Sequence, residues 1–329
     1  MRILITGITG MVGSHLADYI LARHPTVEVH GLVRWRSPRD HIKEIESQII
    51  LHEADLNDLN SLVTLVRRVK PERIFHLGAQ SYVGMSFNAP AQTLETNIIG
   101  TTHLLDAVRI AGIDPKIHIC SSSEVYGQVR ENEVPIREDN PFRPASPYGV
   151  SKVGEDMIAF QYFTSYGVQT IRTRMFTHTG PRRGDVFAES AFAKQIAEIE
   201  AGIREGPVKV GNLASVRTVA DVRDAVRAYW LLLEKCPAGE VYNIGGNQTV
   251  TVGEILERLK GMATCRITHE RDPALIRPSD VTLQIPDTTK FRQATGWEPE
   301  IPLETTLRDL LDFHRNRTRE GRTSPLTHV

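Results

Sequence analysis

Residues 1–20, MRILITGITGMVGSHLADYI, decide the fold. An apolar run at residues 3–5 leads into three glycines spaced three apart, and a helical pattern of apolar residues follows them. A strand, a glycine turn and a helix in this order are typical of dinucleotide binding, because the free N–H groups at the helix start face a pyrophosphate. The glycines allow a tight turn, a close approach of the backbone to the pyrophosphate, and close packing of the helix on the strand. We therefore expect the cofactor to contact Gly7, Thr9, Gly10, Met11, Val12 and Gly13.

The composition excludes several classes of protein. The 329 residues carry a formal net charge of -1 with acids and bases interspersed, which gives no electrostatic basis for a nucleic-acid or anionic-membrane partner. The three cysteines form no C-x-x-C pair and the histidines show no ligand spacing, so neither a disulfide framework nor a metal site is expected. Met1 runs directly into a strand, and no apolar run approaches the ~20 residues that span a bilayer. We expect a soluble, cytoplasmic protein.

Short apolar runs alternate with helical patterns along the first half of the chain. After the opening strand, strands are expected at 27–33, 49–52, 73–77, 116–120 and 168–177, and helices at 59–70, 91–111 and 148–166. This alternation predicts an α/β fold with a doubly wound parallel sheet.

Beyond residue 178 the alternation weakens, which predicts a second, smaller lobe. Helices are expected there at 188–203, 221–235 and 303–313, with short strands near 208 and 216. We expect an NADP-binding Rossmann domain at 1–177, joined by a strand at 241–244, a mostly substrate-binding lobe at 178–315, and a disordered tail at 316–329.

The end of the second expected strand indicates the cofactor. An acid at this point accepts the ribose hydroxyls of NAD, whereas arginine suits the 2′-phosphate of NADP. Arg34 and Arg36 stand there with no acid before Asp40, which favours NADP; a solvated basic loop is the alternative. Asp55 either accepts from the adenine amine or caps the following helix. Further cofactor contacts are expected at the ends of the next strands, from Leu56, Leu77, Ala79 and Gln80.

Four polar side chains carry the expected chemistry. Tyr148 and Lys152 stand four apart at a helix start, so they share one face, and the ammonium is expected to lower the pKa of the phenol. Such a tyrosine takes a proton from a sugar hydroxyl while hydride leaves for the cofactor. Ser122 and Glu124 lie at the carboxyl end of an expected parallel strand, where ligands bind in open α/β sheets. Ser122 is a candidate for a hydrogen bond to the same sugar hydroxyl. Glu124 is a candidate general base for a proton on carbon, or general acid for a leaving hydroxyl. For Tyr148 and Lys152 the alternative is a purely structural role on the helix, and for Glu124 it is a helix cap or a salt bridge in a loop.

Arginines in the second half are candidates for holding a nucleotide diphosphate, because a guanidinium grips phosphate with two parallel hydrogen bonds. They are Arg182, Arg183, Arg217 and Arg277, and a surface ion pair is the alternative for each. His178 either contacts substrate or is a satisfied structural histidine.

Three motifs in order along the chain, GITGMVG, SSSEVYG and YGVSK, make it resemble the extended short-chain dehydrogenase/reductase family of nucleotide-sugar enzymes, over residues 1 to 313. Within that family, AQSYVGMSF and GPRRG are similar to the GDP-mannose 4,6-dehydratases. AFAKQIAEIE, KVGNL and GWEPEIPLETTL are at least as similar to the GDP-4-keto-6-deoxy-mannose reductases. The dehydratase pattern has threonine in place of Ser122 and Asn-His in place of Thr177-His178.

The resemblance implies NADP, a GDP-linked sugar, and a triad of Ser122, Tyr148 and Lys152 with Glu124 as the base at C5. In a dehydratase, hydride leaves C4 as Tyr148 takes the O4 proton, Glu124 takes the C5 proton, water leaves C6, and the hydride returns to C6. A reductase needs no carbon base and consumes NADPH; it stays the alternative. Substrate contacts are implied for Ser81, Ser86, Ser123, Thr177, His178, Arg182, Lys194, Val210, Asn212, Arg217 and Arg277.

Two further expectations follow from the resemblance. The helices at 91–111 and 148–166 are implied to pack against a second copy, in a homodimer or homotetramer. A non-catalytic NADP-sensing protein is disfavoured, because such proteins usually lose the tyrosine–lysine pair that is present here.

Overall fold

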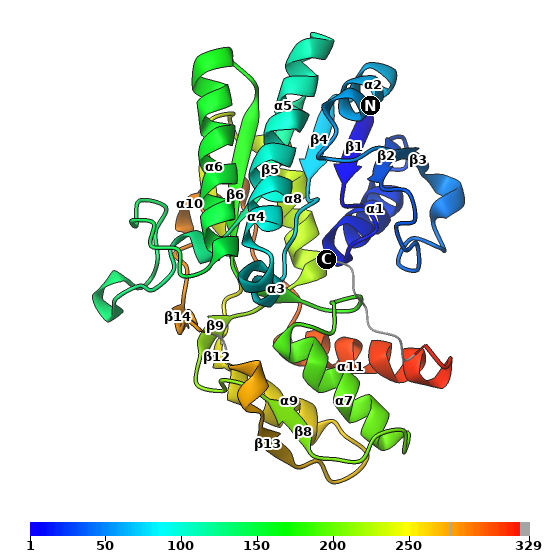
Figure 1. Cartoon of the computed structure of the whole chain (residues 1–329), viewed down its shortest axis with the longest axis vertical. Coiled ribbons are helices and arrows are strands. Elements are labelled where there is room, and N and C mark those ends of the chain that lie inside the picture. The colour runs from blue at the N-terminus through cyan, green and yellow to red at the C-terminus, as the bar shows by residue number, and fades with distance from the viewer. Residues whose placement is uncertain (277, 323–329) are drawn as a thin grey trace.

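A sheet of seven parallel strands forms the centre of the molecule (Figure 1). The computed structural model describes residues 1–276 and 278–322. The strand order is β11-β6-β5-β4-β1-β2-β3, and every neighbouring pair is parallel. The strands are β1 (Arg2–Thr6), β2 (Glu28–Val33), β3 (Ile50–Glu53), β4 (Arg73–His76), β5 (Lys116–Ser122), β6 (Thr170–Met175) and β11 (Val241–Ile244). The predicted doubly wound sheet is confirmed, and the direction of winding reverses between β1 and β4.

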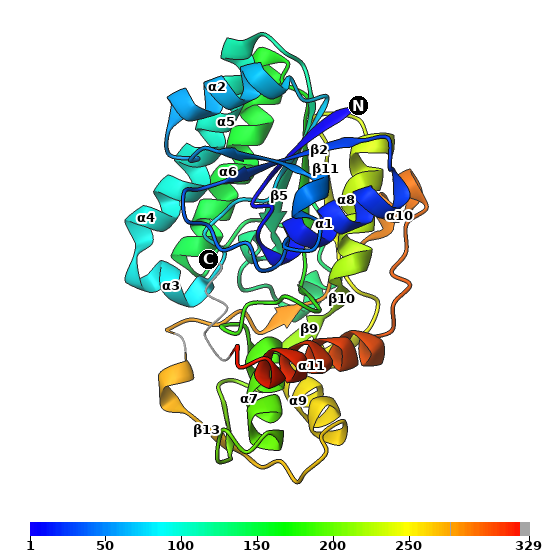
Figure 2. The same ribbon diagram turned by 90° about the vertical axis from the view of Figure 1, so that its right-hand side faces the viewer.

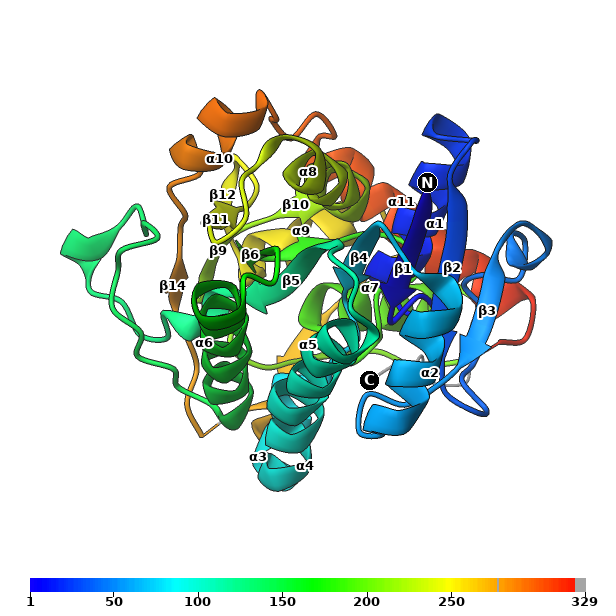
Figure 3. The same cartoon turned by 90° about the horizontal axis from the view of Figure 1, so that it is seen from above.

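Helices cover both faces of this sheet, because the side chains of a strand point alternately to its two sides. Ile3 and Ile5 of β1 pack with α1 and α8, whereas Leu4 packs with α2, α5 and α6. Figure 3 shows the two groups of helices on opposite sides of the strands. The helices are α1 (Met11–Arg23), α2 (Leu59–Val69), α5 (Gly100–Ala111), α6 (Pro147–Tyr166), α8 (Val222–Lys235) and α10 (Thr289–Thr295).

Helix α8 differs from the expectation, because it belongs to the main sheet and not to the smaller lobe. It packs on α1 and β5 and supplies much of the same core. Its Trp230 ring stacks 6.3 Å from the ring of Phe75 on β4 and 3.9 Å from that of His24. The apolar face of this helix therefore completes one of the two layers on the sheet.

The smaller lobe has its own apolar core below the main sheet (Figure 2). Its helices are α7 (Ala188–Glu200), α9 (Val252–Gly261) and α11 (Leu303–Arg319). Short strands complete it: β8 (Val208–Val210) with β13 (His269–Arg271), β12 (Thr249–Thr251) with β9 (Val216–Thr218) and β14 (Leu283–Gln284), and β7 (His178–Thr179) with β10 (Ala220–Asp221).

The last helix continues past the end expected from the sequence. His314 and Thr318 are buried, and His314 Nε2 lies 2.9 Å from Ser190 Oγ of α7, so this side of α11 has a packing partner to its last turn. The expected tail at 316–329 is therefore helical to Arg319, and its residues 323–329 lie outside the described residues. Within the described part of the chain, no helix has the length and apolar character needed to cross a membrane.

Candidate active site

The glycine turn lies at the carboxyl ends of β1 and β4, where the winding of the sheet reverses. Gly7 has φ +70°, and a Cβ there would come 2.9 Å from the Cα of Gly78. A Cβ on Gly13 would come 2.2 Å from the Gly7 carbonyl oxygen. Gly10 caps α1 without a side chain, and the first turn of α1 holds no acid. The start of this helix therefore fits the pyrophosphate of a dinucleotide.

A basic turn follows β2 at the same edge of the sheet. Ser37 N donates to Arg34 O at 2.9 Å, and Arg34 N donates to Ser37 Oγ at 3.0 Å. Arg36 takes the left-handed conformation, with φ 67°, and its guanidinium lies 4.2 Å from the centre of the exposed Trp35 ring. Two arginines at the point that faces the adenosine ribose fit a 2′-phosphate.

Asp55 does not cap the helix that follows it. Its Oδ1 accepts from Asn57 N at 2.9 Å, whereas the cap of α2 is Asp58, whose Oδ1 accepts from Asn60 N at 3.1 Å. Leu56 follows Asp55 directly, and Leu77, Ala79 and Gln80 follow β4 beside the glycine turn.

The helix expected at 91–111 is interrupted by a π-helical turn, η2 (Glu95–Ile99), between α4 (Pro90–Leu94) and α5. Asn97 in this turn is buried; its Oδ1 accepts from Gln80 N at 2.8 Å, and its Nδ2 donates to Gln80 O at 3.0 Å and Ser151 Oγ at 2.8 Å. The side chain thus holds the loop after β4 against α6. No pattern in the sequence marks this role, because a π turn changes the helix period by only one residue.

The four expected chemical groups meet at the ends of β5 and the start of α6. Ser122 ends β5, and its Oγ accepts from Glu124 N at 3.2 Å in the turn η3 (Ser123–Val125). Ser146 caps α6 by accepting from Gly149 N at 3.0 Å, which places Tyr148 and Lys152 in the first turns of the helix. Both side chains are buried.

Burial raises the pKa of Tyr148, while the charge of Lys152 and a hydrogen bond with Ser122 act in the opposite direction. The expected effect of the lysine is therefore present, but desolvation of the phenolate outweighs it in the protein without cofactor. The sequence shows the pair and its spacing; it does not show how deeply the phenol is buried.

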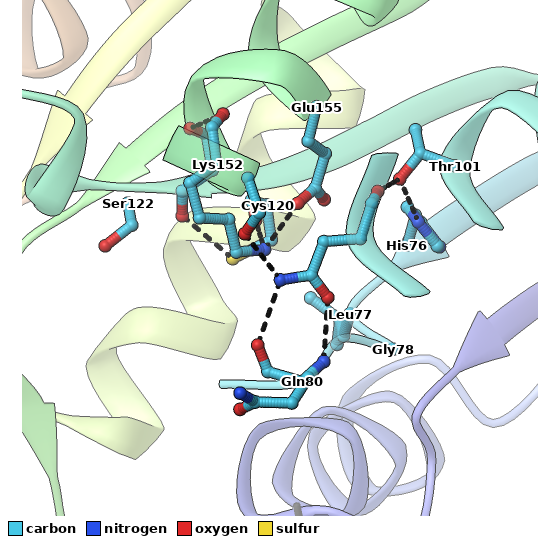
Figure 4. A network of polar contacts seen from close by, with 12 residues as sticks. His76, Leu77, Gly78, Gln80, Thr101, Cys120, Ser122, Lys152 and Glu155 are labelled. Atoms are coloured by element: carbon cyan, nitrogen blue, oxygen red, sulfur yellow. Dashed lines mark hydrogen bonds and ion pairs between the residues drawn. The ribbon is translucent and has the colours of Figure 1, made fainter. Parts of the chain in front are cut away.

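A third buried group stands beside this pair. Figure 4 shows Lys152 and Glu155 turned toward one another, and Lys152 Nζ donates to Glu155 Oε2 at 2.7 Å and to Cys120 O at 2.8 Å. Burial raises the pKa of Glu155 to about 7, although Lys152 opposes the rise. We did not expect this residue, yet its spacing of three from Lys152 on a helix places the two side chains together.

Glu124 is held from the smaller lobe. Gln284 of β14 is buried; its Nε2 donates to Glu124 Oε1 at 3.4 Å, and its Oε1 accepts from Ser123 Oγ at 3.1 Å. The Gln284 side chain thus orients the Glu124 carboxylate and the Ser123 hydroxyl together. Gln284 was missed, because nothing local links it to residues 160 positions earlier.

Several expected substrate residues lie instead in contacts within the chain. Arg182 Nη1 donates to Asp18 Oδ2 at 2.6 Å, Lys194 Nζ donates to Asp185 Oδ2 at 2.6 Å, and Ser86 Oγ donates to Val83 O at 2.7 Å in α3 (Val83–Asn88). Arg182 therefore forms an ion pair, which was the alternative to a contact with the nucleotide diphosphate.

The remaining expected substrate residues that the structure describes follow β4 or β6 of the main sheet or belong to the smaller lobe. Asn212 Nδ2 donates to Asp280 Oδ2 at 2.9 Å, and Arg217 on β9 lies beside the same carboxylate, 3.9 Å away. Thr177 and His178 follow β6, Val210 ends β8, and Ser81 follows Gln80. Burial lowers the pKa of His178 to about 4, so this ring is neutral at physiological pH. Arg277 lies outside the described residues.

Comparison with known proteins agrees with this geometry. A family model described as GDP-mannose 4,6 dehydratase matches residues 4–310. GDP-mannose 4,6-dehydratase of Yersinia enterocolitica is 34% identical, with 92% of this chain and 91% of the relative covered. GDP-6-deoxy-D-mannose reductase of Pseudomonas aeruginosa is 32% identical, with 97% and 99% covered.

A solved structure is similar over the same length. RMD from Pseudomonas aeruginosa, in complex with NADPH, superposes with a TM-score of 0.84 at 32% identity and covers 96% of this chain and 99% of that protein. The expected resemblance is thus confirmed over both lobes. The chain belongs to the GDP-mannose 4,6-dehydratase family of extended short-chain dehydrogenase/reductases, nucleotide-sugar enzymes that depend on a nicotinamide cofactor.

Proposed function

We propose that this chain catalyses the NADP-dependent dehydration of GDP-mannose to GDP-4-keto-6-deoxy-mannose. The observation that carries the proposal is the position of Glu124, on the turn that follows Ser122 and within reach of an orienting amide from Gln284. A redox step alone needs the serine, the tyrosine and the lysine. A carboxylate held in addition supplies the carbon base that a dehydratase requires.

The residues divide the reaction between them. Tyr148 takes the O4 proton with Ser122 bonded to the same hydroxyl, and Lys152 stabilises the phenolate. Glu124 then takes the C5 proton and gives a proton to the C6 hydroxyl, which leaves as water. Bound NADP would supply the reversible hydride chemistry that the C4 and C6 positions of the sugar require. The glycine turn and the start of α1 hold its pyrophosphate, and Arg34 and Arg36 hold its 2′-phosphate.

Incubation with GDP-mannose in deuterated water tests the proposal. The expected product is a 4-keto-6-deoxy sugar carrying deuterium at C5, formed without net change in NADPH absorbance. Unchanged GDP-mannose, together with stoichiometric loss of NADPH on a GDP-4-keto-6-deoxy sugar, would assign the chain to the reductases.

Reduction of GDP-4-keto-6-deoxy-mannose with NADPH is the second candidate function. Two observations favour it: the P. aeruginosa reductase matches this chain over nearly its whole length, and Ser122 stands where the dehydratase pattern has threonine. In such an enzyme Tyr148 donates the proton to O4, and Glu124 has no proton to remove from carbon.

Arg34 and Arg36 are expected to give NADP its advantage over NAD. Replacing both by glutamine removes two cations at the 2′-phosphate and is expected to weaken NADP binding by about 100-fold, with NAD binding little changed. Isothermal titration with the two cofactors measures this. Arg39→Gln is the matched control, because Arg39 Nη1 already donates to Glu46 Oε1 at 2.5 Å. Equal affinities for NADP and NAD in the unaltered protein would contradict the assignment.

We also propose a homodimer or homotetramer that packs through the helical segment at 91–111, which comprises α4, η2 and α5, and through α6. Apolar side chains remain exposed along this face: Ile99, Ile110, Val150, Met157, Phe160 and Tyr166. A buried charge at such a face opposes association, so Met157→Asp is expected to shift the mass measured by light scattering toward the monomer. Met85→Asp, at an exposed apolar residue of α3, serves as control. A monomer before any substitution would refute the proposal.

A further inference from the structure

A buried ion pair stands behind the tyrosine of the site. Lys152 and Glu155 are 4% and 1% exposed, and their charged groups lie 2.7 Å apart. The main-chain oxygen of Cys120 takes a second ammonium hydrogen at 2.8 Å. Among the described residues these two acceptors use two of the three N–H donors of Lys152. The ammonium is thereby fixed in place, with Nζ 6.0 Å from the centre of the Tyr148 ring.

The charges in this cluster are those of Lys152 and Glu155, because the other titratable groups around it are neutral or paired. Burial lowers the pKa of His76 and His118 to about 3, so both rings are neutral, and it raises the pKa of Cys120 and Tyr229. Asp156, the next acid on α6, is bound to Arg172 and Arg174 at 2.9 and 2.8 Å. Burial lowers the pKa of Arg183, while the charges of Glu189, 3.4 Å away, and of Tyr148 raise it.

A lysine favours a nearby phenolate only as far as its charge is not already neutralised. Here the carboxylate of Glu155 contacts the ammonium directly, and its negative charge opposes ionisation of Tyr148, as does burial. The pair is close to neutral as a unit. It therefore supports the phenol in its protonated form, and the charge of Arg183, the other cation that interacts with Tyr148, is offset by Glu189.

We propose that Glu155 is a positioning residue that fixes the ammonium of Lys152 and restrains ionisation of Tyr148 until a further positive charge enters the pocket. The oxidised nicotinamide ring carries such a charge, so the base would form when the oxidised cofactor is present. The inference rests on the proposed function only in giving Tyr148 the role of the proton-transferring group. It extends that function by making the acidity of Tyr148 depend on an acid three residues beyond the lysine.

Titration of the Tyr148 phenol by ultraviolet absorbance tests this without turnover. The difference between the unaltered protein and Tyr148→Phe isolates the tyrosinate signal, and its midpoint without cofactor is expected above the 10.0 of free tyrosine. The same difference, measured on Glu155→Gln, is expected to show a midpoint about one pH unit lower. Glu155→Asp keeps the charge and is expected to stay closer to the unaltered protein than Glu155→Gln does. Asp114→Asn, at an exposed acid before the other end of β5, is expected to cause no shift.

The outcomes separate this proposal from a structural role and from failure of the proposed reaction. A midpoint unchanged by Glu155→Gln, or raised by it, overturns the proposal even if the variant melts at a lower temperature. If Glu155→Gln does not fold, the unaltered protein can still overturn the proposal, because a midpoint below that of free tyrosine means that ionisation of Tyr148 is not restrained. Lack of activity on GDP-mannose would reject the dehydratase assignment and leave the titration result standing.

Discussion

Exchange of the C5 hydrogen with solvent is expected to stop when Glu124 is replaced by glutamine. The amide keeps the shape of the carboxylate and a polar contact with Gln284, but it cannot accept a proton. Loss of a general base lowers the rate of the step by about 100- to 10,000-fold. Proton NMR of the product in deuterated water measures the exchange, and a titration with NADP is expected to give an unchanged affinity, because Glu124 is not among the residues expected to contact the cofactor.

Two comparisons make this result specific. Glu131→Gln changes an exposed acid in the short helix η4 (Glu131–Glu133), beyond η3, and is expected to leave the exchange rate unchanged. Hydride transfer from C4, seen as transient reduced cofactor in a single turnover, is expected to persist in Glu124→Gln, because Tyr148 and Lys152 are intact. Exchange at the unaltered rate in Glu124→Gln would take the role of carbon base away from this residue.

The main sheet was predictable because most of its strands contain a short apolar run between turns, and because the chain alternates strand and helix. The glycine turn was predictable for the same local reason: strand, glycines and helix are adjacent in sequence. Helix α8 was placed in the wrong layer. Its apolar pattern predicts a helix with one buried face, and only the tertiary contacts of Trp230 show which core covers that face.

The residues of the candidate site also differ in whether local sequence or tertiary contacts reveal them. Tyr148, Lys152, Ser122 and Glu124 were predicted from spacing and from their positions at a helix start and at the end of a strand. Gln284 and Asn97 depend on contacts between distant segments, and no sequence pattern marks them. Glu155 has the right helical spacing, but acids on helices are usually exposed, and its burial becomes visible only when β5 and α6 are packed together.

Binding of NADP is expected to fall sharply when Gly13 is replaced by alanine. The added Cβ would lie 2.2 Å from the Gly7 carbonyl oxygen and 2.7 Å from the Cα of Ile8. Both atoms belong to the backbone, so the helix start must move away from β1. Overpacking of this kind costs about 1–3 kcal/mol in the free energy of unfolding. The same movement takes the N–H groups of α1 away from the pyrophosphate, and an affinity loss of at least about tenfold is expected.

Gly261→Ala is the matched control for this change. The same methyl group is added near the end of α9, where nothing described lies within 4 Å of the new Cβ, and helix propensity favours alanine by about 1 kcal/mol. This control is expected to unfold at the same or a higher denaturant concentration and to bind NADP normally. Isothermal titration and urea unfolding of both variants test the pair. An alanine at position 13 with unchanged NADP affinity would mean that the pyrophosphate does not bind at the start of α1, and the orientation of the cofactor toward Tyr148 would then have to be derived anew.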